Sequence, residues 1–431
     1  MLVSEKLLHY IWQHQYYQKN NLFTDEGESL IVIKQGTYNN NQGPDFLNAS
    51  VRINNILLAG NIEIHINSSD WKLHQHQTDA NYNNVILHIV WNNDAEVTNK
   101  NGQLIPQFTI SNLVPKWLLD RYTQLMDAPD SLPCSSFLPY IKPIIWSSWK
   151  VRLTIERMEE KTDKILALYN ESNNHWEEVL WWMIAYNFGL KLNADLFLQV
   201  AKSIPINILG KHKNQLFQIE ALLMGQANLL SENNNDTFDN EQLKLIKEHQ
   251  YLSQKYGLHP IAIKPVFLRM RPPGFPTIRI AQLARLIQQS SHLFSTIKEI
   301  KDLDKLKEIL HVNTSSYWDN HYVFGKVSVE REKYTGNTLV ENIIINTIIP
   351  ILFAYAKLHK DDSIKERMIQ WLIQLAPENN IILTKWEKEG ISNDSAFDSQ
   401  GLLQLTKHYC KEKRCMECAI GNAILTSAKN N

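Results

Sequence analysis

The sequence has few cysteines and almost no excess of charge. Four cysteines occur among 431 residues, and the formal net charge is −1. Three of the four crowd near the C-terminal end, which is not the distribution of a secreted disulfide framework. The near-neutral balance gives no global indication of a nucleic-acid partner or a membrane surface.

Leader and membrane segments are also missing. The opening stretch "MLVSEKLLHYIWQHQYY" contains glutamate, histidine and glutamine, so it predicts an amphipathic helix and not a secretory signal. We find no apolar run long enough to span a bilayer. These absences predict a soluble cytoplasmic protein with no membrane partner.

Hydrophobic residues make up 44% of the chain, enough for a sizeable core, and the length predicts two or three domains. Charge is uneven along the chain. Residues 1–130 carry 8 Lys+Arg and 13 Asp+Glu, a local charge of −5, so the remainder carries 36 and 32, or +4. An acidic first part therefore precedes a mildly basic second part.

Two patterns divide the chain. From about residue 28 to 110, short segments rich in isoleucine and valine alternate with Asn/Gly turns, which predicts strands. A helix precedes them, and the short segment "SSDWKLHQHQTDANY" lies between two of them. From about residue 115 the pattern is almost wholly helical. The sequence therefore predicts an α+β domain at residues 1–130, built from a helix and a mixed sheet, and a larger all-α domain at residues 131–431.

The stretch "GPDFLNASVRINNILLAGNIEIH" carries the strongest candidate site. Side chains alternate along a strand, so Glu63 and His65 share one face of "GNIEIHI" while the isoleucines occupy the other. Asp45 opens the neighbouring strand of the same hairpin. Two carboxylates and an imidazole held together repel one another unless a cation or a proton lies between them. Oxygen-rich sets suit Mg²⁺ or Mn²⁺, so Asp45 and Glu63 are the predicted ligands.

Further polar residues follow directly on this strand. We expect Asp70 and His74 at the rim of the Asp45 site, because their loop leaves the strand that carries Glu63. His74 and His76 form a His-x-His pair that either binds a transition metal or is simply solvated. His88 lies inside the apolar run "VILHIV", which favours a buried histidine over a ligand.

This arrangement resembles the PD-(D/E)XK nuclease superfamily, whose restriction-endonuclease-like core runs helix, three strands, helix, strand. The family's signature is an aspartate on one strand and (D/E)-x-K on the next, matched here by Pro44-Asp45 and Glu63-Ile-His65. The resemblance implies an additional acid on the first helix, and Glu5 takes that place. His65 stands where lysine is usual, so it would act as base or ligand. Lys34 and Lys72 are alternative sources of the missing ammonium group.

A cysteine cluster closes the chain in "HYCKEKRCMECAIGNAIL". Cys410, Cys415 and Cys418 have the spacing C-x4-C-x2-C, in which one tight turn presents two thiolates to a metal. Cys134 or His408 would supply a fourth ligand. Four thiolates suit Zn²⁺ or a [4Fe–4S] cluster, and a closed set of this kind has a structural role.

The proline-rich turn "RMRPPGFPTIRIAQLARLI" is a second candidate for anion binding. Arg269, Arg271 and Arg279 surround a turn that opens a helix, and helix N-termini bind phosphate. The alternative is a structural junction whose arginines pair with nearby acids. The tryptophans at 176, 181 and 182 are predicted to be core residues.

The chain as a whole resembles the bacterial family catalogued as domain of unknown function 2851, through "NQGPDFLNA", "GNIEIHINSSDWKLHQH", "RPPGFPTIRIAQLA" and "KRCMECAIGNAIL", among other segments. Two functions follow from the residues. One is a metal-dependent phosphodiesterase acting on DNA or RNA. The other is a non-catalytic nucleic-acid-binding or scaffold protein with a degenerate nuclease-like fold, which the near-neutral charge favours. A hydrolase of a different phosphorylated substrate is a third alternative.

Overall fold

The computed structural model describes all residues except 1–2, 129–131, 231–238, 291 and 428–431. The chain forms two compact units, Met1–Trp149 with Gln404–Asn431, and Lys150–Leu403. The last segment of the chain therefore belongs to the same unit as the first 149 residues. The boundary expected between residues 130 and 131 lies outside the described residues.

The first unit contains a seven-stranded mixed sheet in the order β1-β2-β4-β5-β6-β7, with β3 paired to β4. Strand β4 is antiparallel to both β2 and β5, whereas β5, β6 and β7 run parallel. The strands are β1 (Leu22–Phe23), β2 (Ser29–Lys34), β3 (Thr37–Tyr38), β4 (Phe46–Ile53), β5 (Ile56–Asn67), β6 (Val85–Asn92) and β7 (Gln107–Thr109). The prediction of a helix followed by a mixed sheet is confirmed.

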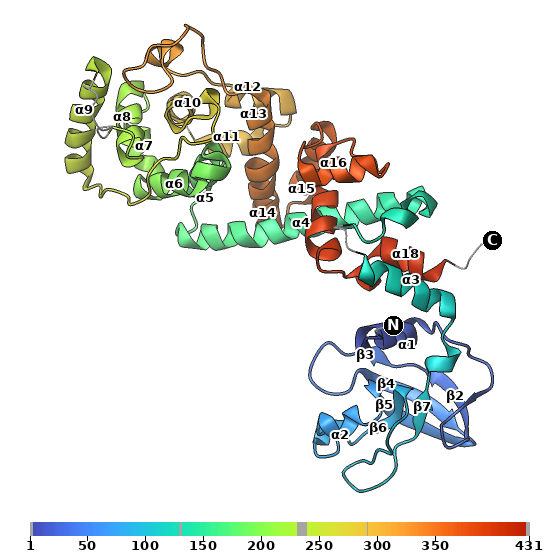
Figure 1. Cartoon of the computed structure of the whole chain (residues 1–431). Helices are drawn as coiled ribbons and strands as arrows, with labels where there is room; N and C mark the ends of the chain where they lie inside the picture. The colour runs from blue at the N-terminus through green and yellow to red at the C-terminus, as the bar shows by residue number, and fades with distance from the viewer. Residues whose placement is uncertain (1–2, 129–131, 231–238, 291, 428–431) are drawn as a thin grey trace. The chain divides into compact units, whose positions relative to one another are not determined.

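Helix α1 (Glu5–His14) precedes the sheet and packs on β3 and β5 (Figure 1). Ser4 caps its N-terminus by accepting a hydrogen bond from the backbone N–H of Leu7. Leu7, Leu8 and Ile11 are buried at the i, i+1 and i+4 positions of one apolar face. The remaining face carries Glu5 and His9, one helical turn apart.

The connection from β5 to β6 crosses over between two parallel neighbouring strands and contains little regular structure. It contains one turn of helix, α2 (Asp70–Leu73), and the 3₁₀ turn η1 (Ala80–Tyr82). Trp71 is fully buried and, with Tyr82 and three aliphatic residues, forms a separate small core. The connection is therefore folded onto the sheet and is not a free loop.

The rest of the first unit is helical. It contains the 3₁₀ turns η2 (Ser111–Leu113), η3 (Ser135–Tyr140) and η8 (Cys415–Glu417), the π-helical turn η7 (Thr406–Cys410), and the helices α3 (Lys116–Asp127) and α18 (Ala419–Thr426). Helix α18 packs on α3, and the Arg121 guanidinium in α3 donates to the carbonyl of Ile424 in α18.

The regular elements of the second unit are all helices among its described residues, apart from one isolated β-bridge between His321 and Val327. Helix α4 (Pro143–Glu171) leads into it. The others are α5 (Trp176–Phe188), α6 (Leu190–Ser203), α7 (Ile206–Lys211), α8 (Leu216–Gln226), α9 (Asn240–Tyr256), α10 (Pro276–Gln289), α11 (Leu293–Glu299), α12 (Leu303–Leu310), α13 (Asn337–Ile343), α14 (Ile349–His359), α15 (Asp362–Gln374), α16 (Ile381–Lys388) and α17 (Ala396–Leu405). Three short turns complete it, η4 (Pro272–Gly274), η5 (Ser316–Asn320) and the π-helical η6 (Ile344–Ile348). The prediction of a mostly helical second part is confirmed.

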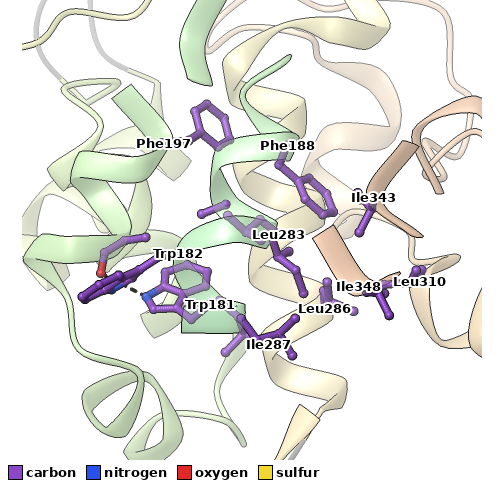
Figure 2. Packing of buried hydrophobic residues seen from close by; sticks show 14 of the residues in the cluster. Trp181, Trp182, Phe188, Phe197, Leu283, Leu286, Ile287, Leu310, Ile343 and Ile348 are labelled. Atoms are coloured by element: carbon purple, nitrogen blue, oxygen red, sulfur yellow. Dashed lines mark hydrogen bonds between the residues drawn. The ribbon is translucent and has the colours of Figure 1, made fainter. Parts of the chain in front are cut away.

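A single large hydrophobic core holds these helices together (Figure 2). Trp181 and Trp182 are buried in it, and the Trp181 indole N–H donates to the carbonyls of Ala201 and Ile204. Trp176 packs against the same core while remaining partly exposed. The prediction that the tryptophans at 176, 181 and 182 are core residues is thus confirmed.

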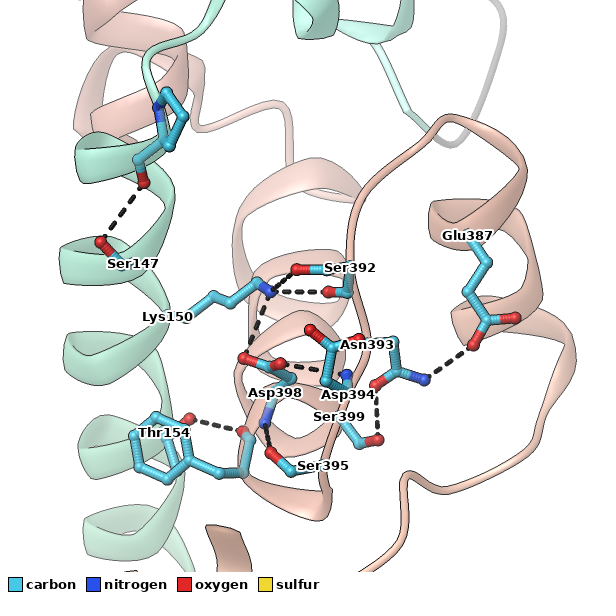
Figure 3. A network of polar contacts seen from close by, with 12 residues as sticks. Ser147, Lys150, Thr154, Glu387, Ser392, Asn393, Asp394, Ser395, Asp398 and Ser399 are labelled. Atoms are coloured by element: carbon cyan, nitrogen blue, oxygen red, sulfur yellow. Dashed lines mark hydrogen bonds and ion pairs between the residues drawn. The ribbon is translucent and has the colours of Figure 1, made fainter.

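Polar contacts join the start of this unit to its end (Figure 3). The buried Lys150 ammonium donates to the Ser392 carbonyl at 2.6 Å and lies 3.2 Å from the Asp398 carboxylate. The Thr154 hydroxyl donates to the Phe397 carbonyl at 2.9 Å. A buried ammonium needs such partners, because an unpaired charge away from water is strongly unfavourable.

The expectation that no apolar run is long enough to span a bilayer is wrong. The continuous helical stretch Asn337–His359 is long and apolar enough to do so by length and composition. Its most apolar window is 78% buried within the structure, as in the core helix of a soluble protein. The fold is compatible with a cytoplasmic protein.

Candidate metal centre at the β4–β5 hairpin

The hairpin of β4 and β5 places Asp45 beside Glu63. Phe46 is opposite Ile62 in the antiparallel register. Asp45, which precedes Phe46, therefore lies beside Glu63, which follows Ile62. The backbone N–H of Asp45 donates to Glu63 Oε2 at 3.1 Å, and that of Ile64 donates to Asp45 Oδ2 at 2.9 Å. The Asp45 N–H thus orients the Glu63 carboxylate, and the Ile64 N–H orients the Asp45 carboxylate.

Glu63, His65 and His88 lie on one face of the sheet. Glu63 and His65 are two residues apart on β5, and Glu63 is in register with His88 on the parallel strand β6. The His65 Nδ1 and His88 Nε2 atoms are 2.8 Å apart, so one of these nitrogens donates to the other. All three residues are at most 5% exposed, and Ile62 and Ile64 on the opposite face are also buried. His88 is the buried histidine that the sequence predicts.

The connection between β5 and β6 adds two more imidazoles to this face. His74 Nδ1 lies 3.1 Å from His65 Nε2, and His76 Nε2 lies 3.3 Å from Glu63 Oε1. One ligand atom from each of His65, His74 and His76 lies within 4.8 Å of the other two. The Glu63 Oε1 atom is also 3.6 Å from His65 Nε2. Three imidazoles and a carboxylate therefore converge at one point.

Burial controls the charge of the Glu63 carboxyl. Desolvation, helped by repulsion from Asp45, raises the pKa of Glu63 to about 9. The hydrogen bond from the Asp45 N–H and the field of His9 oppose that rise. In the metal-free protein Glu63 is therefore protonated near neutral pH, and a cation bound beside it would release that proton.

The imidazoles around Glu63 are held neutral. Burial, aided by neighbouring imidazoles, lowers the pKa of His65 to about 2 and that of His88 to about 3. Burial also lowers the pKa of His76. Neutral imidazole is the form that binds metals, so these rings are available as ligands without first losing a proton.

Helix α1 contributes an acid and a base to the same place. The His9 Nε2 atom lies 3.1 Å from Asp45 Oδ2. Burial raises the pKa of Glu5, and the charges of His74, Asp45, His9 and Asp70 all act on it. Glu5 and His9 are four residues apart and so lie on one helix face. The sequence prediction includes Glu5 but misses His9, although that spacing was a usable signal.

The rim residues fall into two kinds. His74 is exposed and contacts His65 directly, so it is a potential ligand as well as a rim residue. Asp70 opens α2, and its Oδ2 accepts from the backbone N–H of Asn67 at 3.0 Å. His76 is 10% exposed and stacks on Tyr82, with ring centroids 3.7 Å apart.

Lys34 and Lys72, the alternative ammonium groups, are exposed. Among the described residues neither forms a hydrogen bond or an ion pair with the site.

The metal-free protein should lose stability as the pH falls below about 6.5, the reference pKa of histidine. The pKa values of His65, His76 and His88 are lowered in the folded state, so their contribution to stability is present above the unfolded pKa and is lost on acidification. The raised pKa values of Glu63 and Glu5 act oppositely. The histidines set the net direction because each of the three takes up a proton on unfolding below about pH 6.5.

Urea denaturation of EDTA-treated protein at about pH 7.5 and about pH 5.5, read by pulse proteolysis, measures this. His65→Asn should reduce the acid-induced shift of the N-terminal fragments, whereas His311→Asn, at an exposed position in the second unit, should not. An equal midpoint at both pH values would contradict the burial of neutral histidines.

The structure brings the three arginines of the predicted phosphate site together less clearly than it does the residues of the hairpin site. Arg269 and Arg271 are exposed, and Arg269 adopts a positive φ of 62° in the loop before η4. Arg279 lies in the first turns of α10 and donates to Gln282 Oε1 at 2.9 Å, while burial lowers its pKa to about 10. Among the described residues no ion pair to an acid is recorded for these three arginines. A phosphate site here remains a prediction.

The four cysteines are all buried and free of disulfides in the first unit. Burial raises the pKa of Cys410, and the thiols of Cys134, Cys418 and Cys415 raise it further. The other three thiols are thus near enough to Cys410 to act on it electrostatically. They come from three separate stretches of chain, around residues 134, 410 and 415–418.

Comparison with known proteins shows the family. Residues 5–381 match the family described as "Protein of unknown function (DUF2851)", so the chain belongs to this family. No curated protein matches the sequence. No solved structure matches it either.

Proposed function

We propose that the first unit is a metal-dependent phosphodiesterase of the PD-(D/E)XK type that acts on nucleic acid. The observation that carries the proposal is the buried Glu63 carboxylate, 3.6 Å from His65 Nε2 and 3.3 Å from His76 Nε2, beside Asp45. An acid and several neutral imidazoles share a desolvated space without an ammonium or guanidinium group among the recorded contacts of Glu63. Such a set is stabilised by a bound cation.

The element order supports the nuclease-like interpretation. The series α1, β2, β4, β5, α2, β6 follows the order helix, three strands, helix, strand, and the acids lie at β4 and β5 as the family signature requires. Two features depart from the family. His65 replaces the usual lysine, and the crossover helix α2 is only four residues long. Both departures lie beside the proposed site, and the order of the strands in the sheet is unaffected by them.

The donor set fits a first-row transition ion better than Mg²⁺. His65, His74 and His76 offer nitrogen, and Glu63 offers oxygen. Imidazole suits Zn²⁺, Fe²⁺ and related ions, Mn²⁺ accepts mixed sets, and Mg²⁺ prefers oxygen ligands with several waters. We therefore place Mn²⁺ or Zn²⁺ at this site, where the sequence alone led us to expect Mg²⁺ or Mn²⁺.

The protein's own residues then have distinct roles. When bound, such an ion supplies Lewis acidity and lowers the pKa of a bound water. Glu63 and the imidazoles hold it, and the Ile64 N–H fixes the direction of the Asp45 carboxylate. His9, 3.1 Å from Asp45, is partly exposed and placed to exchange a proton with that carboxylate. Glu5 and Asp45 form the acidic, solvent-facing side where water enters.

A cleavage assay tests the proposal. EDTA-treated protein is supplied with Mg²⁺, Mn²⁺ or Zn²⁺ and given single-stranded DNA, duplex DNA, RNA and bis(p-nitrophenyl) phosphate. We expect hydrolysis with Mn²⁺ or Zn²⁺ that exceeds hydrolysis with Mg²⁺, and a loss of about 100-fold or more in Asp45→Asn. Asp120→Asn, at an exposed position of the same unit, is the matched control and should retain full activity.

The alternative is a non-catalytic binding or scaffold protein. The excess of acidic residues in the first 130 positions favours it, because nucleic-acid binders normally carry a basic footprint. Metal binding without hydrolysis of any of these phosphodiesters would select this alternative. Hydrolysis of bis(p-nitrophenyl) phosphate alone would indicate a different phosphorylated substrate.

A further inference from the structure

We propose that Cys134, Cys410, Cys415 and Cys418 form a second, structural metal centre that holds the two chain segments of the first unit together. The ligand would be a thiophilic centre, either one Zn²⁺ or an iron–sulfur cluster. This inference is independent of the phosphodiesterase site, since it uses different residues and different ligand chemistry.

The first argument is that all four cysteines of the chain lie in one unit. A chain of 431 residues has only four cysteines, and all four are buried and reduced there. Scattered buried cysteines behave as small hydrophobic residues and have no reason to gather in one part of a fold. Three of these four lie between residues 410 and 418, and Cys134 is near enough to Cys410 to act on its thiol. Four thiolates are the ligand number of a tetrahedral site.

The second argument is the backbone around the C-x2-C pair. Cys415 opens the 3₁₀ turn η8, and Cys418 is the N-cap of α18. The Cys418 N–H donates to the Cys415 carbonyl at 3.3 Å, which closes the tight turn. A Cβ on Gly421 would lie 2.0 Å from that same carbonyl oxygen, so only glycine permits this approach. The sequence is thus built to keep the two thiols on one compact turn.

The third argument is local charge. Four thiolates around one divalent ion leave a net charge of −2, which needs compensation in a buried place. Lys411, Lys413 and Arg414 lie between Cys410 and Cys415. Arg414 is paired with Glu412 and Glu417, so Lys411 and Lys413 remain as the compensating charges. Lys413 donates to the Met126 carbonyl of α3, and Arg414 donates to the His408 carbonyl at 3.1 Å. The cationic loop is therefore fixed beside the thiols.

The groups around Cys418 are suited to a metal-bound sulfur. Cys418 is the N-cap of α18, and the backbone N–H groups of Ile420 and Gly421 and the Trp149 side chain are directed at its thiol. N–H donors directed at sulfur are typical around a thiolate that binds a metal.

A centre of this kind has a clear purpose in this fold. The chain leaves the first unit at residue 149 and returns at residue 404, after the whole helical unit. Cys134 lies on the outgoing side of that excursion, and Cys410, Cys415 and Cys418 lie on the returning side. A metal bound by both sides would close this very long loop, and its binding energy would become folding energy.

Metal analysis of the purified full-length chain tests the proposal. We expect about one equivalent of zinc, or about four of iron with inorganic sulfide, that survives dialysis against EDTA. Protein produced with Co²⁺ should show the sulfur-to-cobalt charge-transfer band of a thiolate site. Either zinc or iron with sulfide supports the centre, and a wild-type chain with four freely titratable thiols and neither metal would overturn it.

Two sets of variants locate the ligands. Cys415→Ser with Cys418→Ser, and Cys134→Ser alone, should each lose the thiolate band, whereas His65→Asn with His76→Asn should keep it. His408→Gln should also keep it. Loss of the metal in His408→Gln, with retention in Cys134→Ser, would overturn the four-thiolate assignment. If a cysteine variant does not fold, the wild-type metal content and cobalt spectrum still decide the question.

Discussion

Glu63→Gln should abolish metal-dependent hydrolysis and, at the same time, stabilise the metal-free protein at alkaline pH. Glutamine has the same shape, and its amide oxygen can still accept the hydrogen bond from the Asp45 N–H. It cannot supply the negative charge that a cation needs. Changes to outer-shell residues alone lower metal affinity by about 10–100-fold, so removal of a direct ligand should cost at least about 100-fold.

The gain in stability follows from the direction of the Glu63 pKa. Burial raises it to about 9, above the unfolded value, so the neutral form is favoured in the folded state. The contribution of Glu63 to stability is therefore present at low pH and is lost as the pH rises toward 9. Glutamine does not titrate and loses nothing over this range. The urea midpoint of the metal-free variant at about pH 8.5 should exceed that of the wild type.

Opposite effects on function and stability separate a ligand from a structural residue. Mn²⁺ affinity by calorimetry, hydrolysis rate and the urea midpoint are measured on the same preparations. Glu26→Gln, at an exposed turn of the same unit, should change none of the three. A Glu63→Gln protein that is less stable at every pH would mean that the carboxylate holds the hairpin together, and the metal centre would be abandoned.

Strand alternation predicts part of this site correctly. Glu63 and His65 share a face because side chains alternate along β5, and Asp45 lies beside them because a hairpin joins β4 to β5. Both relations are local in sequence. His9 was within reach by the same logic, since it is one helical turn from Glu5.

The remaining ligands depend on tertiary structure. His76 approaches Glu63 only because Trp71 is buried and folds the β5–β6 connection onto the sheet. No periodicity in "SSDWKLHQHQTDANY" encodes that fold, so the pair at 74 and 76 reads equally well as solvated. His88 meets His65 through the parallel register of β5 and β6, which the sequence does not specify. The same tertiary burial explains why the site is richer in nitrogen than the two carboxylates suggested.

The return of the C-terminal segment to the first unit illustrates the same limit. Helix α17 (Ala396–Leu405) runs across the boundary at residue 404, so nothing local shows that the segment from residue 404 leaves the helical unit. The signal was chemical: the C-x4-C-x2-C spacing lacks a fourth ligand, and Cys134 lies near the other end of the excursion. The number of ligands that a metal site needs can therefore indicate that two distant chain segments lie close together, where secondary-structure patterns cannot.

Gly421→Ala should disrupt the cysteine centre although it leaves all four thiols in place. The new Cβ would lie 2.0 Å from the Cys415 carbonyl oxygen and 2.7 Å from its carbon. Both are backbone atoms, so a rotamer change cannot relieve the overlap. Overpacking a well-packed site typically costs about 1–3 kcal/mol, and a backbone clash belongs at or above the upper end of that range.

The clash can be relieved only if α18 moves away from η8, which separates Cys418 from Cys415. The variant should therefore lose most of its EDTA-resistant metal and unfold at lower urea in the fragments from the first unit. Gly210→Ala is the matched control, because a Cβ there meets no atom within 4 Å and alanine is favoured inside helix α7, and it should keep both properties. A Gly421→Ala protein with full metal content and unchanged stability would show that the thiols need no fixed turn. In that case the ion would be held without the close approach of α18 to η8, and the glycine would have no part in the centre.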